Sequence, residues 1–317
     1  MADPLRRAFS NDSTNSTDSS TAVGILASVV AYCFWGLMPL YWRQLAEAAP
    51  VEILAHRIIW SFVFIMAGLV VAGRLPSAAR VLGRLLRSPR ENGTFIIVLA
   101  AVFASVNWLV NILGVNTGRV VELGLGMFLT PLATVALGVI VFSERLSGLR
   151  LVAVLLAACG VAVLIAGLDR FPWIAIGVSA SWAIYGALKK KVTIDAADSV
   201  AIEHGLLLVP ALAYIFFAPG GYAFHFAGGF SSGLSLLLIG TGIMTSIPMV
   251  LFSVSAQKLP MTLLGIIQYL NPVLTLSVGV VVFAEPVTDA EKAALAFIFA
   301  AVVLYVVSSR QKQNPAS

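Results

Sequence analysis

The segments LTPLATVALGVIVFSE (129–144) and LNPVLTLSVGVVVFAE (270–285) are two copies of one pattern, 141 residues apart in the chain. Half of their positions are identical, including a proline in the first turn, a glycine in the third turn and the glutamate that ends each copy. Chance likeness between two apolar helices would not keep Pro, Gly and Glu in one register. The sequence therefore predicts an internal duplication, and this prediction organises the rest of the chain.

The composition around this repeat is that of a membrane protein. Of 317 residues, 59% are hydrophobic and only 11% are charged, whereas soluble domains carry about 25% charged residues. This excludes a soluble enzyme, a disordered chain and a nucleic-acid-binding protein. The two cysteines, Cys33 and Cys159, lie inside apolar runs. Neither a disulfide framework nor a metal site is expected from them, and no cofactor is predicted.

Ten apolar runs follow a polar N-terminal tail, and each has the length that spans a bilayer as a helix. They do not alternate polar and apolar residues as the strands of a membrane barrel do. The sequence thus predicts an all-α integral membrane protein with ten transmembrane helices, over 23–42, 52–72, 94–115, 123–142, 150–168, 172–188, 199–218, 233–256, 261–283 and 289–308.

The repeat divides these helices into two halves of five. Because five is odd, the halves must enter the membrane with opposite orientation, which makes an inverted-topology repeat. Such repeats are typical of secondary transporters, with the solute site near the membrane midplane. The predicted organisation is a disordered cytoplasmic tail (1–20), a first five-helix repeat (21–169), a second five-helix repeat (170–309) and a cytoplasmic tail (310–317).

The distribution of basic residues predicts the orientation. If the N-terminus is cytoplasmic, fifteen of the twenty Lys and Arg residues fall in cytoplasmic segments, as the positive-inside rule requires. The longest connector, about 73–93, is an Arg-rich cytoplasmic segment. We therefore expect a multi-pass protein of the inner membrane with both termini in the cytoplasm.

Four stretches carry a resemblance to a known family: FWGLMPLYW (34–42), EILAHRIIWS (52–61), NWLVNILGVNTGRVVE (107–122) and GIIQYLNP (265–272). With the ten-helix repeat, they resemble the EamA family of the drug/metabolite transporter superfamily, and most closely its RarD branch. The resemblance covers residues 23–308. It implies proton- or gradient-linked export of small solutes, and it supplies no substrate.

Polar and aromatic side chains within apolar helices are the candidates for the solute site. Asn107 and Asn111 share one helix face, and Gln268 and Asn271 share another. Interhelical hydrogen bonding is the alternative explanation for these amides, as core packing is for the aromatic residues. The candidates for the cavity wall are Tyr32, Trp35, Asn107, Trp108, Asn111, Trp182, Tyr185, Gln268, Tyr269 and Asn271.

Four ionisable residues are candidates for coupling or gating: His56, Arg57, Glu203 and His204. Arg57 could hold an anionic group, and His56 or Glu203 could take a proton. Because neighbours on a helix point about 100° apart, we expect Glu203 to act without His204. In the alternative, all four residues lie at the membrane interface and snorkel.

The remaining features predict scaffold. The fifth and tenth helices carry Ala158, Ala162, Ala166, Ala296 and Ala300 at a spacing of four, which predicts close packing or a homodimer contact. Glu144 and Glu285 are each expected to cap the start of the next helix, and Arg119 and Glu122 to form a surface pair.

The predicted function is a non-enzymatic secondary active transporter. It would move a small organic metabolite or drug-like solute by alternating access, most simply by proton-linked export. The alternative is a channel or a membrane-embedded sensor. The expected partners are the solute and the lipid bilayer, with no nucleic acid.

Overall fold

The computed structural model describes residues 4–87, 93–146, 148–166, 170–217, 233–284 and 286–311. Within these ranges every regular element is a helix, and nine segments are long and apolar enough to cross a membrane. The predicted all-α membrane fold is therefore confirmed.

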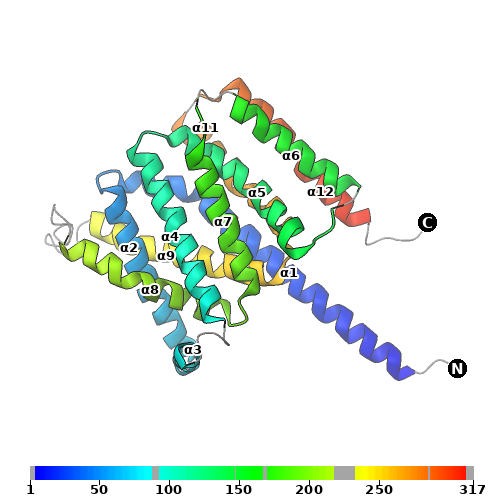
Figure 1. The fold of residues 1–317 in the computed structure, drawn as a ribbon, viewed down its shortest axis with the longest axis horizontal. Coiled ribbons are helices and arrows are strands. Elements are labelled where there is room, and N and C mark those ends of the chain that lie inside the picture. Colours follow the sequence, from blue (N-terminus) through cyan, green and yellow to red (C-terminus); the bar gives the residue numbers. More distant parts are fainter. Residues whose placement is uncertain are drawn as a thin grey trace.

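Each of the ten predicted ranges contains helix in its described residues (Figure 1). The first half contains α1 (Pro4–Trp42), α2 (Pro50–Val71), α4 (Thr94–Asn116), α5 (Val120–Phe142) and α6 (Leu149–Ala166). The second half contains α7 (Trp173–Lys191), α8 (Ala196–Phe217), α9 (Gly233–Lys258), the pair α10 (Met261–Gln268) and α11 (Leu270–Phe283), and α12 (Asp289–Gln311). α7 is not among the nine candidate spans, and it ends on three lysines. That α7 crosses the membrane, which would bring the number of crossings to ten, therefore remains a prediction.

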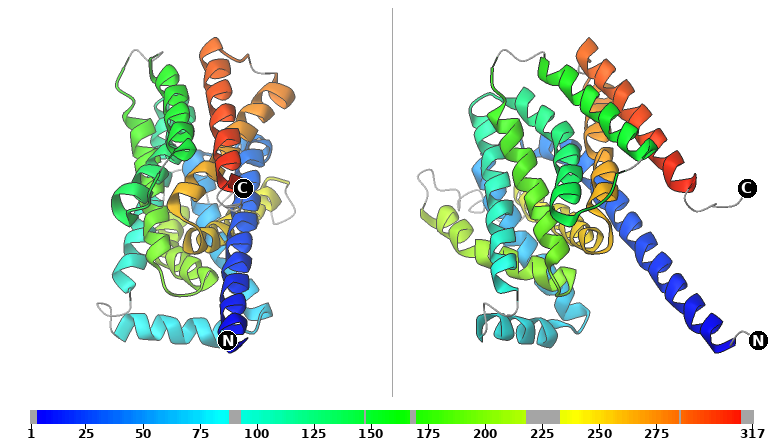
Figure 2. Two further views of the ribbon diagram at one scale, coloured as in Figure 1. Left: turned by 90° about the vertical axis from the view of Figure 1, so that its right-hand side faces the viewer. Right: turned by 45° about the vertical axis from the view of Figure 1, so that its right-hand side comes forward.

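The structure differs from the sequence prediction at the N-terminus and in the first long connector. α1 begins at Pro4, so helix runs through a segment that was expected to be disordered; no Gly or Pro interrupts residues 5–23. The connector between α2 and α4 contains a helix that was not predicted, α3 (Leu75–Arg87), which lies across the end of the bundle (Figure 2). Val81 of α3 is buried and Arg80 is exposed, which is the pattern of an amphipathic helix at an interface.

The ninth predicted helix is broken into α10 and α11 at Tyr269. Pro272 explains the position of the break, because a proline ring conflicts with the carbonyl group four residues earlier. That carbonyl belongs to Gln268, the last residue of α10. The equivalent Pro131 leaves α5 continuous, so the two halves differ at the same repeat position.

The packing of the helices follows the repeat. α1 packs against α9 as α7 packs against α4, and α1 packs against α10 and α11 as α7 packs against α5. The ends of α5 and α11 also match. Ser143 and Ala284 both have a φ of +54°, and they are the only non-glycine residues with a positive φ in the described part of the chain. After each helix a backbone N–H donates to the carbonyl of Gly138 or Gly279, respectively. These are equivalent positions at the shift of 141 found in the sequence.

α6 and α12 form a pair at one edge of the molecule (Figures 1 and 2). Their contact uses Ala153, Ala157 and Gly160 of α6 and Ala294 and Ala301 of α12, all of them buried. The predicted stripe faces elsewhere: Ala162, Ala166, Ala296 and Ala300 are exposed, and Ala158 is half-buried. The small residues that join these helices are therefore not the predicted ones, and a homodimer contact remains a prediction.

Outside the membrane spans, Arg74 joins the connectors of the two halves. It forms salt bridges to Asp195 at 3.0 Å and to Asp198 at 3.3 Å. The hydrogen bond with Asp195 raises the pKa of Arg74 above its ordinary value, so the guanidinium stays charged in this bridge from the α2–α3 connector to the start of α8.

Candidate functional site

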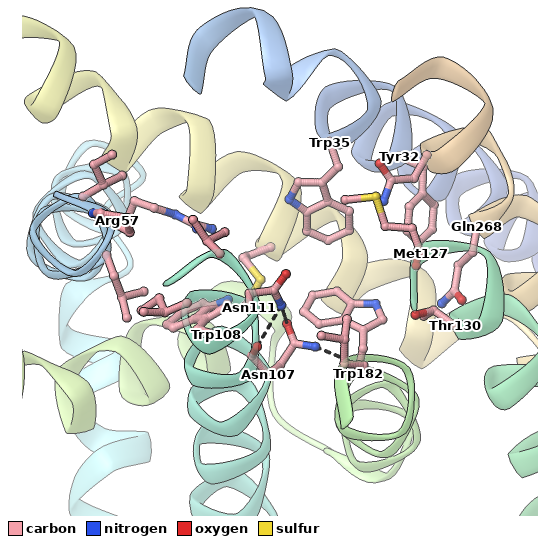
Figure 3. A pocket seen from close by; sticks show the side chains of 18 of the residues that line it. Tyr32, Trp35, Arg57, Asn107, Trp108, Asn111, Met127, Thr130, Trp182 and Gln268 are labelled. Carbon is pink, nitrogen blue, oxygen red and sulfur yellow. Dashed lines mark hydrogen bonds between the residues drawn. The ribbon is translucent and has the colours of Figure 1, made fainter. Parts of the chain in front are cut away.

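A cavity of about 290 Å³ lies where the two halves meet (Figure 3). Its wall is built from the last third of α1, the first halves of α2, α5 and α7, the second half of α4, one residue of α9, and the region of the α10–α11 break. The lining residues are Tyr32, Trp35, Pro50, Ile53, Leu54, Arg57, Asn107, Trp108, Asn111, Ile112, Val115, Met127, Thr130, Pro131, Val178, Trp182, Met249, Gln268 and Asn271.

Eight of the ten predicted wall residues line this cavity, and Tyr185 and Tyr269 do not. Tyr269 is buried on the other side of the helix, in an apolar groove that it shares with Ile298 and Tyr305. It follows Gln268 directly, so the two side chains point in different directions around the helix. Tyr185 lies beyond Trp182 and is fully buried.

The amides divide between packing and the cavity. Asn107 Nδ2 donates to the Val178 carbonyl at 2.9 Å and to Ser181 Oγ at 3.1 Å, so part of its role is to join α4 to α7. Asn111 Nδ2 donates to the Asn107 carbonyl at 2.8 Å. Interhelical bonding therefore explains Asn107 in part, while the Asn111 side-chain oxygen accepts no hydrogen bond from the described residues.

Gln268 joins two helices that occupy equivalent positions in the two halves. Its Oε1 accepts a hydrogen bond from Thr134 Oγ1 at 2.9 Å, so α10 meets the equivalent helix α5 across the centre of the molecule. Its buried Nε2 has no hydrogen-bond partner among the described residues, and the Tyr32 hydroxyl lies beside it. A buried amide donor without an acceptor is rare in folded proteins. Gln268 lines the cavity, but this nitrogen atom is itself covered, so a solute could reach it only if the side chain turned.

Five aromatic rings close one end of the cavity: Tyr32, Trp35, Trp182, Tyr185 and Phe252. The Trp35 and Trp182 rings meet edge to face with centroids 5.2 Å apart, and Tyr185 stacks on Phe252 at 5.7 Å. A shift of 150 residues superposes Tyr32 on Trp182 and Trp35 on Tyr185. Equivalent aromatic residues of the two halves thus meet at the centre of the molecule.

A buried ion pair lies behind these rings. Lys189 Nζ is 2.6 Å from Glu203 Oε1 and donates to Ser199 Oγ at 2.6 Å. Glu203 also accepts hydrogen bonds from Ser199 Oγ at 2.8 Å and from the Tyr185 hydroxyl at 2.9 Å. Lys189 and Ser199 are completely buried and Glu203 is 1% exposed.

That Glu203 acts without His204 stays a prediction, but the network shows that Lys189 is its ionic partner. Lys189 and Ser199 were missed because the run Lys189–Lys191 fits a solvated helix end. A signal was present, since Trp182, Tyr185 and Lys189 recur at i, i+3 and i+7, and Ser199 and Glu203 at i and i+4.

The two candidate histidines lie outside the cavity wall. His56 is 3% exposed. His204 is 1% exposed, with Nδ1 2.9 Å from the Val200 carbonyl oxygen and its ring 5.9 Å from that of Trp108. Its Nε2 is buried without a hydrogen-bond partner in the described part of the chain. This burial, with that of Glu203, does not fit the snorkelling alternative, which needs side chains that reach the interface.

Arg57 is the coupling candidate that reaches the cavity. Its guanidinium points from α2 into the space between the aromatic rings, opposite Gln268 (Figure 3). Nε donates to Thr245 Oγ1 at 3.1 Å, and the group lies over the rings of Trp42 and Trp108, with 5.0 Å and 5.6 Å to their centroids.

Two predicted roles of acidic residues are corrected. Glu144 does not cap the next helix: its carboxylate accepts hydrogen bonds from the Met261 and Thr262 amides at 2.7 Å and 2.8 Å, and so caps α10 in the other half. The predicted pair of Arg119 and Glu122 is present at 2.6 Å, but Glu122 is buried rather than on the surface and also pairs with Arg170. Glu285 lies outside the described residues.

Comparison with known proteins agrees with this architecture. Residues 22–166 and 172–307 each match the EamA-like transporter family. The chain is 39% identical to protein RarD of Streptomyces exfoliatus, over 90% of this chain and 89% of that one. It is 35% identical to the uncharacterized transporter YojE of Bacillus subtilis, over 92% and 95% of the two chains. A solved crystal structure has the same fold, with a TM-score of 0.69 at 17% identity over 94% of this chain and 99% of the other.

The two family matches cover the two predicted halves, and the relatives of this length are named as transporters or as RarD. The helical membrane fold and the cavity between the halves are those expected of such proteins. The chain therefore belongs to the EamA family of the drug/metabolite transporter superfamily, in its RarD branch.

Proposed function

We propose that this protein is a secondary active transporter that carries a small organic solute across the inner membrane by alternating access. The observation that carries the proposal is the cavity at the junction of the two halves. Aromatic rings form much of its wall, and amides from both halves converge on it. Ligand sites usually measure about 300–1,000 Å³ and combine apolar walls with a few polar groups. A cavity of about 290 Å³ suits a solute with one or two rings.

The arrangement around the cavity supports an outward-facing state. In the predicted orientation, Pro50 and Val115 lie near the outer surface, and both line the cavity. Toward the inner surface lie the five aromatic rings and the Lys189–Glu203 pair. Release to the other side would require these groups to separate, as alternating access demands.

Export, proton coupling and assembly belong to the same proposal. The basic residues support cytoplasmic termini. Glu203, His204 and His56 are buried groups that could change protonation between the two facing states. A homodimer would use the outward-facing alanines of α6 and α12. The solute leaves chemically unchanged.

The proposal is tested in proteoliposomes with an imposed pH gradient and a panel of small organic solutes. A carrier predicts uptake that saturates and is stimulated by solute on the opposite side, whereas a channel shows neither property. Gln268→Leu and Asn271→Leu are expected to impair transport while insertion into the membrane is normal, because Leu favours the bilayer. The matched control is Ser277→Leu, since Ser277 lies on α11 with its side chain exposed away from the cavity. Normal transport by both cavity variants would exclude this cavity as the solute site.

A further inference from the structure

Arg57 is the one charged residue among the described residues that line the cavity, and none of those residues is an Asp or Glu. The two nearby buried acids, Glu52 of α2 and Glu203 of α8, do not contribute to the wall. The cavity wall therefore carries a positive charge that none of its described lining residues balances with an acidic group.

The contacts of Arg57 leave its terminal nitrogens unused. Only Nε donates a hydrogen bond, to the Thr245 hydroxyl at 3.1 Å. The Trp42 and Trp108 rings attract the cation, but such contacts are worth about 0.5–2 kcal/mol. No carboxylate lies within 4 Å of Arg57 in the described part of the chain. Two other cations at helix ends are paired by contrast: Lys189 contacts Glu203 at 2.6 Å and Arg119 contacts Glu122 at 2.6 Å.

An unpaired buried cation is costly unless a counter-charge arrives. The planar guanidinium can bind a carboxylate through two parallel hydrogen bonds. The same group faces a wall of rings that includes Trp35, Trp108 and Trp182. At the far end of the cavity, Gln268 contributes its side-chain amide to the wall, beside the Tyr32 hydroxyl.

We propose that the transported solutes are organic anions, in which a carboxylate binds Arg57 and a planar apolar body lies against the tryptophans. A neutral acceptor at the other end of the solute would meet the Gln268 amide. Amines would be disfavoured by the same charge. This inference rests on the proposed transport function and narrows it to one chemical class of solute.

The test is a binding series on the full-length protein in nanodiscs of neutral phosphatidylcholine, measured by isothermal titration calorimetry against empty nanodiscs. The probes share one ring system and differ in charge: 2-naphthoate, 2-naphthamide and 2-naphthylmethylamine. The wild type is expected to bind the carboxylate about tenfold or more tighter than the amide, and to bind the amine weakest. Arg57→Gln should abolish this preference and leave the affinity for the amide within about twofold, whereas Arg57→Lys should retain part of it.

Arg43→Gln is the matched control, because it also removes one cation near the outer surface. Arg43 stacks on Phe283 at 4.6 Å and does not line the cavity, so the preference should persist. Equal affinity for carboxylate and amide in the wild type, no binding of any probe, or a preference that survives Arg57→Gln would each overturn the anion assignment. The transport function fails separately: Arg57-dependent binding with no solute exchange would keep the anion site and reject the carrier. Exchange of neutral solutes that is unaffected by Arg57→Gln would keep the carrier and reject the anion site.

Discussion

The buried pair Lys189–Glu203 makes a quantitative prediction about stability. Replacing Lys189 with Met keeps a side chain of similar length and leaves the Glu203 carboxylate with only the Ser199 and Tyr185 hydroxyls as donors. Both charged side chains are at most 2% exposed, so solvent would not screen the remaining charge. Breaking such a pair typically costs about 3–5 kcal/mol. We expect Lys189→Met, and likewise Glu203→Gln, to lower the free energy of unfolding by about this amount.

The double variant Lys189→Met/Glu203→Gln removes both charges and should be more stable than the sum of the single changes implies, by about 2 kcal/mol or more. The measurement is equilibrium unfolding in mixed detergent micelles, followed by far-ultraviolet circular dichroism. Lys191→Met is the control, because it removes a cation from the same helix end where the side chain is exposed; a change below about 1 kcal/mol is expected. If each single change costs less than about 1 kcal/mol, or if the two effects simply add, the pair is not the buried ionic contact described above.

Three further predictions concern the scaffold. Glu144→Gln should lower the free energy of unfolding by about 1–2 kcal/mol, because it removes the charged cap from the start of α10; an unchanged unfolding curve would contradict the capping role. Gly265→Ala should be destabilising by about 1–3 kcal/mol, since its Cβ would lie 2.7 Å from a Val135 methyl carbon and 2.8 Å from the Pro131 carbonyl oxygen. The repeat-equivalent Gly124→Ala meets no atom within 4 Å and should be neutral, so equal effects in the two variants would refute the close contact. A tag at Ser317 should be inaccessible to impermeant reagents in intact cells, and labelling there would mean an odd number of crossings or reversed insertion.

The sequence predicted the parts of this molecule that depend on local pattern. Long apolar runs are sufficient to identify membrane helices, and the shared proline, glycine and glutamate identified the repeat. Most of the cavity wall was also predictable, because polar side chains within membrane helices usually face an interior. Tyr269 shows the limit of this reasoning: one position along a helix rotates a side chain by about 100°, and Gln268 and Tyr269 therefore face opposite environments.

Contacts between distant segments could not be predicted in the same way. Lys189 belongs to a run of three lysines, and only the fold shows that it turns toward α8 while Lys191 is exposed. Glu144 precedes α6 in the chain but caps α10, because α5 and α10 pack together across the two halves. A helix-capping rule identifies the kind of partner, a free backbone amide, but tertiary packing decides which helix supplies it.

The pairing of α6 with α12 has a consequence for how the protein is made. α6 completes the first half and is synthesised before α7 to α11, yet its buried face of Ala153, Ala157 and Gly160 packs mainly on the last helix. Until α12 inserts, α5 covers a small part of that face, and the rest has only lipid or transient partners. The packing of the first half is therefore incomplete when its own sequence has been synthesised. It is completed, together with that of the second half, only when α12 inserts. A chain truncated before Asp289 would lose part of the first half as well as the end of the second, and would offer membrane quality-control proteases an unpaired helix.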